Sequence, residues 1–285
     1  MPGEMILRIW DVEHGQCAML THVQNNVPGR LAMIDSGCTD SWHPSKHIRY
    51  ALNRTRLDYL FITNADQDHM SDLAGLWDEG LTVPVMYRNP TYTGDEYRRI
   101  KEADAPLTKD ASRYASSCST FNAPVSEPFN THMGGITCTT FHNPYPAFTD
   151  TNNLSLAVFI KYANMKFLFP GDLEGPGWEA LLQRYDFIQE LTGTNVLVAS
   201  HHGRRSGFYE ALFDKISPSV VVISDKSKAH DTQETVPDYR EVVKPDGVLV
   251  RTTDKRRRVL TTRRDGWIEF ICNDTHYAID TEFKG

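Results

Sequence analysis

Residues 60–75 read Leu60-Phe-Ile-Thr-Asn64-Ala-Asp66-Gln-Asp68-His69-Met-Ser-Asp72-Leu-Ala-Gly75, an apolar strand that ends abruptly in polar groups. Before a helix begins, the strand is followed by four groups able to bind a metal ion: Asn64, Asp66, Asp68 and His69. Ligands often bind at strand ends in open α/β architectures. Carboxylate oxygens with one imidazole suit Mn²⁺, Zn²⁺ or Fe²⁺, and the shortage of nitrogen and sulfur favours Mn²⁺. The alternative is an Asp-rich loop that caps the helix.

Two further apolar strands end in potential ligands. The segment Lys166-Phe-Leu-Phe-Pro-Gly171-Asp172 places a carboxylate after a strand, and Gly171 permits close approach of the backbone to an ion. The segment Asn195-Val-Leu-Val-Ala-Ser200-His201-His202-Gly203 does the same with two imidazoles. Because three strands in order end in such groups, the sequence favours a metal site over a simple helix cap.

Short apolar runs bounded by turn residues predict strands along the whole chain. In the N-terminal half they cover residues 5–12, 18–22, 30–35 and 57–63, with a helix over 44–53. In the C-terminal half they cover residues 135–141, 154–162, 166–169, 195–199 and 220–224, with helices over 178–185 and 207–216. Residues 247–253, 258–262 and 266–272 predict a small antiparallel meander. The mixed order indicates an α/β fold with two sheets covered by helices.

The chain has 285 residues, and we interpret residues 1–285 as a single domain. Residues 91–130 are polar, with helices expected over 95–104 and 111–121. Their few large apolar residues could hardly fill a core of their own, so we interpret this segment as an insertion or lid. Core packing and base stacking both stay open for the aromatic residues beside it, which are Trp77, Tyr87, Tyr92, Tyr97 and Phe121.

Composition excludes several classes of protein. With 40% apolar and 24% charged residues we do not expect a disordered chain. Residues 1–5 lack the basic start and the apolar stretch typical of a signal peptide, and no run approaches about 18 consecutive apolar residues. We therefore expect a cytoplasmic protein with no membrane partner. Five scattered cysteines without a C-x-x-C pair disfavour a disulfide framework and a zinc knuckle.

The formal net charge is −7, so the protein as a whole does not attract polyanions. A nucleic acid would have to bind at a local basic patch. The basic concentration lies in residues 251–258, followed by Arg263 and Arg264. It is either a solvated strand pair with its turn or a patch that tracks phosphates.

Taken together, these motifs resemble the metallo-β-lactamase-fold hydrolases, most closely the branch typified by the hydrolase domain of the DNA-uptake protein ComEC. The resemblance covers almost the whole chain and includes a closing segment made of residues 221–230 and 248–252. Its motifs, in order, are Asp11-Val-Glu-His14-Gly15-Gln16, Ile34-Asp35-Ser36-Gly37, Asn64-x-Asp66-x-Asp68-His69, Gly171-Asp172-Leu-Glu174 and Ser200-His201-His202-Gly203. The resemblance implies an αβ/βα sandwich, in which two mixed sheets pack face to face with helices outside.

The resemblance also implies one or two divalent ions per chain, Mn²⁺ or Zn²⁺, with Asp172 as a bridge. One ion would be held by Asp68, His69 and His201, and the other by Asp66 with Asn64. The family usually has histidine where this chain has Asn64. Because a neutral amide oxygen is a poor transition-metal ligand beside imidazole, that site would be weaker or filled only when substrate is bound.

Catalysis, by the same resemblance, would use a metal-activated hydroxide that attacks a phosphodiester. Asp172 would position the hydroxide, and His202 would protonate the leaving group, with His230 as the second candidate. His202 could equally orient His201, and His230 could be exposed to solvent.

Four residues are candidates for substrate binding: Arg204, Arg205, Asn152 and Ser155. Guanidinium groups suit phosphate, although only one of the two adjacent arginines can point inward. Asn152 and Ser155 match an Asn/Ser pair of the family and would hydrogen-bond the substrate, or they could simply start a strand. We interpret the remaining histidines as surface or hydrogen-bonded filler, namely His14, His43, His47, His132, His142 and His276.

The sequence thus predicts a metal-dependent phosphodiester hydrolase, a nuclease acting on DNA or another nucleic acid. One alternative is a small-molecule phosphodiesterase for a cyclic nucleotide or choline-phosphate ester, with residues 91–130 closing the pocket. Another is a non-catalytic binding module in which Asn64 marks a degenerate metal site. β-Lactam hydrolysis is disfavoured because it usually accompanies a nitrogen-rich first site and export. Protein partners are unknown from the sequence.

Overall fold

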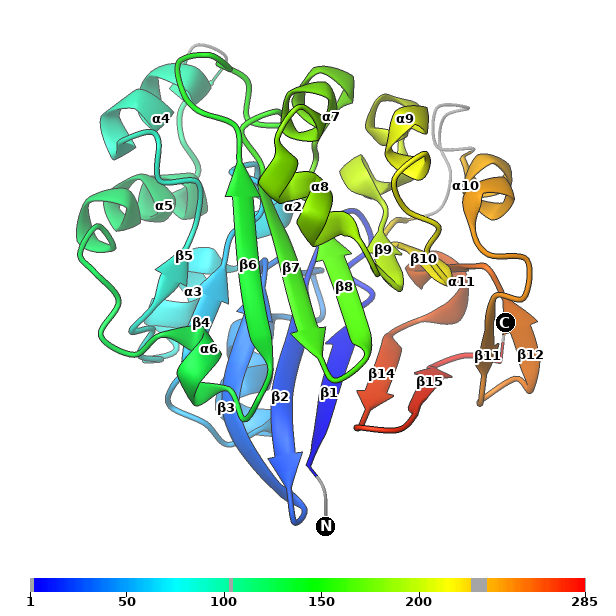
Figure 1. Cartoon of the computed structure of the whole chain (residues 1–285). Helices are drawn as coiled ribbons and strands as arrows, with labels where there is room; N and C mark the ends of the chain where they lie inside the picture. The colour runs from blue at the N-terminus through cyan, green and yellow to red at the C-terminus, as the bar shows by residue number, and fades with distance from the viewer. Residues whose placement is uncertain (1–2, 103–104, 227–234, 285) are drawn as a thin grey trace.

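Two mixed β-sheets pack face to face, and helices cover their outer faces (Figure 1). The structure is a computed structural model that describes residues 3–102, 105–226 and 235–284. Among these residues the first sheet has seven strands, in spatial order β15 (Tyr277–Thr281), β14 (Ile268–Cys272), β1 (Glu4–Ile9), β2 (Ala18–Gln24), β3 (Val27–Ile34), β4 (Tyr59–Phe61) and β5 (Met86–Tyr87). The second, counted the same way, has six: β13 (Val259–Thr261), β10 (Val220–Ile223), β9 (Val196–Val198), β8 (Met165–Phe169), β7 (Leu156–Tyr162) and β6 (Thr137–His142). The predicted αβ/βα sandwich is confirmed.

The central core lies between the two sheets. In β1 every second residue is fully buried, so Met5, Leu7 and Ile9 face the second sheet while their neighbours face outward. Across the gap, the Phe167 ring of β8 meets Phe270 of β14 edge to face, with ring centroids 5.1 Å apart. Interdigitation of this kind fixes the two sheets relative to each other.

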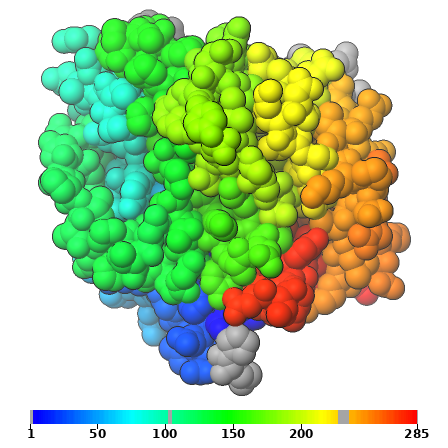
Figure 2. Space-filling view, in the orientation of Figure 1, coloured from blue at the N-terminus to red at the C-terminus, as the bar shows by residue number. Residues whose placement is uncertain are grey.

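Two outer cores lie beneath the helices. On the first sheet the covering elements are α1 (Pro44–Lys46), the π-helical turn η1 (His47–Ala51), α2 (Gln67–Met70), α3 (Leu73–Asp78), α4 (Gly94–Glu102) and α5 (Lys109–Thr120). On the second they are α7 (Gly175–Leu182), α8 (Tyr185–Leu191), α9 (Glu210–Phe213) and α10 (Val236–Val242). The space-filling view shows green to yellow segments over much of this face (Figure 2). None of the described helices is long and apolar enough to cross a membrane.

The predicted C-terminal meander is wrong. Strand β11 (Val248–Val250) pairs with β12 (Lys255–Arg257), whereas β13 joins β10 in the second sheet and β14 joins β1 in the first. β13 is buried along its whole length, and its position beside β10 in the second sheet provides that burial. Tertiary partners therefore override the local strand order. The short helix α11 (Thr262–Asp265) makes the crossing between the sheets.

The helix predicted over 207–216 is also shorter than expected, because α9 covers only part of it. A 3-10 turn, η3 (Arg205–Gly207), precedes α9. Gly207 passes so close to Ser200 that a Cβ there would lie 2.4 Å from the Ser200 carbonyl oxygen. The chain therefore turns tightly after the histidine pair instead of continuing as a helix.

Residues 91–130 contribute α4 and α5, which pack onto the outer core of the first sheet. Tyr97 and Tyr114 are buried with ring centroids 4.8 Å apart, and the hydroxyls of Tyr92 and Tyr114 lie 2.6 Å apart. The Tyr97 hydroxyl donates to the carbonyl of Ala65 at 3.1 Å. Core packing therefore explains the tyrosines of this segment, and Tyr97 ties it to the loop after β4.

Candidate metal centre

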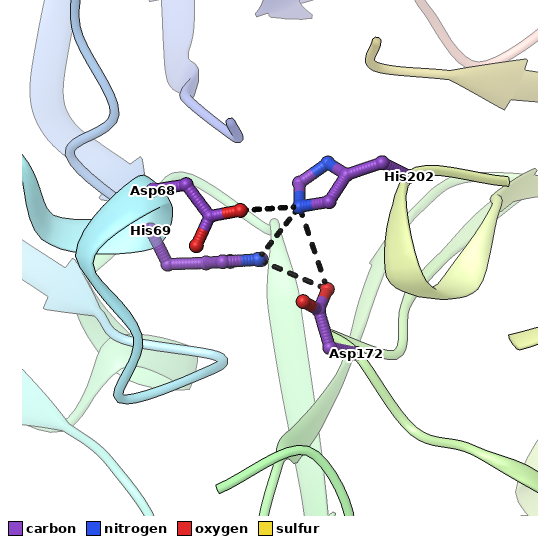
Figure 3. A group of neighbouring side chains, drawn as sticks. All are labelled: Asp68, His69, Asp172 and His202. Atoms are coloured by element: carbon purple, nitrogen blue, oxygen red, sulfur yellow. Dashed lines mark hydrogen bonds and ion pairs between the residues drawn. The ribbon is translucent and has the colours of Figure 1, made fainter. Parts of the chain in front are cut away.

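Three strands deliver four side chains to one rim of the sandwich, where they point toward one another (Figure 3). Strand β4 leads into α2, which carries Asp68 and His69. Strands β8 and β9 run parallel, and they lead into Asp172 and into His202 of the turn η2 (Ser200–Gly203). The parallel strands β8 and β9 end at the same edge of the second sheet, and the packing of the two sheets brings the end of β4 to that edge, so residues far apart in the sequence meet here.

The cluster is tight. Its four ligand atoms lie within 4.8 Å of one another. His69 Nε2 is 3.0 Å from Asp172 Oδ1 and 3.2 Å from His202 Nε2. His202 Nε2 is 3.1 Å from Asp68 Oδ2. Asp68 is partly exposed and the other three side chains are buried, so the cluster opens to solvent on the Asp68 side.

A buried acceptor holds the far nitrogen of each imidazole. His69 Nδ1 lies 2.9 Å from Oδ2 of Asp35, whose other oxygen accepts the Thr63 backbone N–H at 2.7 Å. His202 Nδ1 lies 3.0 Å from the carbonyl oxygen of Ser224. Because an acceptor requires a hydrogen, we place the ring hydrogen on each Nδ1. Each Nε2 then presents a lone pair to the cluster in the neutral ring.

Two nitrogen lone pairs and two carboxylates thus converge, and positive charge must balance them. Burial favours the neutral rings, but Asp172 and Asp35 raise the pKa of His69 well above its usual value. At His202, burial lowers the pKa, but Asp172 and Asp68 outweigh burial and raise the pKa above its usual value. Burial also disfavours the ionised carboxylates, yet the two imidazoles hold the pKa of Asp68 and of Asp172 below the usual range. Protons supply the positive charge when no metal is bound.

Two imidazoles and two carboxylates also fit a divalent cation such as Zn²⁺ or Mn²⁺. Two packed mixed sheets with this cluster at their rim define an αβ/βα sandwich protein with a candidate metal centre. The family model described as the metallo-beta-lactamase superfamily matches residues 23–224, and the chain belongs to that superfamily.

Solved structures resemble the chain at low identity. A structure described as a new diphosphatase from the PhnP family is 10% identical, with 95% of this chain and 98% of that chain covered and a TM-score of 0.43. A variant of the CmlA beta-hydroxylase is 12% identical, with 93% of this chain and 53% of that chain covered and a TM-score of 0.50. Likeness at this level of identity concerns the fold alone. No curated protein matches the chain.

His202, rather than His201, faces the cluster. Both residues have left-handed backbone conformations, with φ of 51° and 53°, and their ring centroids lie 6.4 Å apart. His201 Nδ1 lies 3.1 Å from Glu174 Oε1 and 3.0 Å from Ser206 Oγ, away from the other ligand atoms. The ligand position expected of His201 therefore goes to His202, because two successive left-handed residues send adjacent rings in different directions.

An open cavity of about 600 Å³ borders the cluster. Asp68 and Asp172 line it together with His14, Cys38, Asp66, Gln67, Ser71, Asn152, His201 and Arg204. Of the two arginines expected to bind substrate, Arg204 lines this cavity. Arg205 turns to the surface, where its Nη2 lies 3.0 Å from Asp238 Oδ2. A substrate in the cavity would therefore meet only the first guanidinium.

The other expected site residues have different surroundings. Ser155 is fully buried, and its Oγ accepts the backbone N–H of Asp172 at 3.0 Å, so it positions Asp172 and does not reach the substrate. Asn152 lines the cavity, but its Oδ1 accepts from Asn64 Nδ2 at 3.2 Å. His230 lies outside the described residues.

Sequence reasoning missed two residues at the centre. His14, interpreted as filler, lines the cavity with its Nε2 3.2 Å from Asp68 Oδ2, and burial beside His202 lowers its pKa to about 4. Asp35 holds His69. Both residues belong to motifs quoted for the resemblance. Gly15, which follows His14, indicates that the loop carrying His14 packs closely against another segment. A Cβ on Gly15 would lie 2.5 Å from the Asp68 carbonyl oxygen, so this loop must press against α2.

Proposed function

We propose that the protein hydrolyses phosphodiester bonds and that nucleic acid, DNA in particular, is its substrate. One observation carries the proposal: a buried cluster of two imidazoles and two carboxylates borders an open cavity with Arg204 on its wall. A divalent cation held by Asp68, His69, Asp172 and His202 would supply an activated water and neutralise charge on the attacked phosphate.

Residues of the chain orient the imidazole ligands and neutralise the charge of the phosphate. Asp35 and the Ser224 carbonyl hold the imidazoles, so both Nε2 atoms would be oriented to bind a cation at the cluster. The Arg204 guanidinium can donate two parallel hydrogen bonds to a phosphate. Since His202 is a ligand in this arrangement, the role of proton donor to the leaving group passes to His201. Glu174 holds the Nδ1 of His201, and His201 lines the cavity.

A small phosphodiester is the second candidate substrate. A cavity of about 600 Å³ lies in the range of small-ligand pockets.

The basic C-terminal run supports DNA binding less than its sequence suggests, because Arg251 pairs with Asp280 and Arg257 lies 3.1 Å from Asp265. The carboxylate partners neutralise both guanidinium groups.

Digestion of plasmid DNA, a linear duplex and bis(p-nitrophenyl) phosphate with added Mn²⁺ tests the proposal. We expect cleavage of DNA by the wild type and its loss in Asp172→Ala, whereas the matched exposed control Asp78→Ala keeps full activity. Cleavage of the small diester without cleavage of DNA would favour the second candidate. Equal DNA cleavage by the wild type and Asp172→Ala would overturn the proposal.

A further inference from the structure

A lysine from residues 91–130 engages the carboxylate expected to bind the other ion. Lys101 lies at the end of α4, and its Nζ is 2.5 Å from Asp66 Oδ1. The second oxygen of Asp66 accepts from Thr151 Oγ1 at 2.8 Å and from Asn64 Nδ2 at 3.4 Å. Both oxygens of Asp66 are therefore occupied by hydrogen-bond donors.

The neighbouring amides do not offer a replacement. Asn64 turns its Nδ2 toward Asp66 and Asn152, and an amide nitrogen has no lone pair for a metal. The Asn64 Oδ1 is buried and has no hydrogen-bond partner among the described residues. One neutral oxygen is a weak ligand compared with the two imidazoles and two carboxylates of the cluster.

From this contact we infer that the protein binds one divalent cation, at the cluster of Asp68, His69, Asp172 and His202, and that Lys101 supplies the positive charge at the outer position. An ammonium group balances the charge of the Asp66 carboxylate, and the three hydrogen-bond donors on Asp66 compete with a transition metal for its lone pairs. The inference rests on the proposed metal-dependent function. It also gives residues 91–130 a role, because this segment completes the charge balance of the site.

Manganese binding tests the inference without any assay of activity. Metal-free protein is titrated with Mn²⁺ by calorimetry, and bound manganese is measured by elemental analysis and by electron paramagnetic resonance. We expect about one equivalent for the wild type, with the spectrum of an isolated ion. Lys101→Met removes the charge, frees Asp66 and should gain a second, weaker equivalent. Lys101→Arg restores the charge and should stay near one.

Lys109→Met is the matched control, because Lys109 lies in the same segment and pairs with the exposed Asp78. It should bind about one equivalent, as the wild type does. Two equivalents in the wild type, with the spectrum of a coupled pair, would overturn the inference and leave the proposed function intact. A Lys101→Met protein that stays at one equivalent would also overturn it. No binding of any divalent metal by the wild type would instead contradict the proposed function.

Discussion

The Nε2 atoms of His69 and His202 lie 3.2 Å apart, although the opposite nitrogen of each ring already donates to a fixed acceptor. Two neutral rings held this way would direct lone pairs at each other and at the nearby carboxylates. The pair is therefore built to share a positive charge, which is a proton in the metal-free protein and a divalent cation in the loaded one.

This relationship predicts how stability depends on pH. The folded pKa values of His69 and His202 lie above the ordinary value of about 6.5. Their protonation therefore stabilises the metal-free protein fully below about pH 6.5, and that contribution is lost as pH rises through the folded pKa values. Mn²⁺ competes with those protons, so the gain in Tm on adding Mn²⁺ should be larger at about pH 8 than at about pH 6. Differential scanning calorimetry measures the gain in Tm at each pH. A gain in Tm that does not depend on pH would contradict the conclusion that His69 and His202 share a positive charge.

Asp35→Asn should weaken metal binding without unfolding the protein. The amide keeps the shape of the carboxylate but removes the charge that fixes the His69 ring, so we expect Mn²⁺ affinity to fall by about 10- to 100-fold. Calorimetric titration measures the change. Asp58→Asn is the matched control, because Asp58 is also buried but accepts from the Leu31 backbone N–H. An equal loss in both variants would show a general effect of buried charge.

The histidine pair can be separated by substitution. His202→Gln removes a ligand and should abolish tight Mn²⁺ binding, whereas His201→Gln should retain it and lose turnover. Binding is read by calorimetry and turnover with the phosphodiester that the wild type cleaves. If His201→Gln lost the metal and His202→Gln kept it, the assignment made from the Nε2 positions would be reversed.

Phe167→Ala should destabilise the protein by about 3–5 kcal/mol, because it leaves a cavity between the two sheets next to Phe270. Urea denaturation followed by fluorescence gives the free energy of unfolding. Phe283→Ala removes a ring that is 51% exposed and should change it little. Equal effects of the two substitutions would contradict the position of the central core.

The fold was largely predictable from apolar runs, and three members of the cluster, Asp68, His69 and Asp172, were predictable from polar groups at strand ends. The choice between His201 and His202 was not, because it depends on two left-handed residues that a sequence pattern does not specify. The contact of Lys101 with Asp66 joins segments far apart along the chain, and no local pattern encodes it. The meander failed for the same reason, since β13 and β14 pair with distant strands.

The pairing of β14 with β1 has a consequence for biosynthesis. Cys272 lies opposite Met5, so β1 gains this neighbour only after more than 260 further residues have been synthesised. Until then one side of β1 offers unsatisfied backbone amides and carbonyls to any other nascent chain. The edge of β1 that β14 covers in the folded protein is therefore open to intermolecular pairing while the chain is being made.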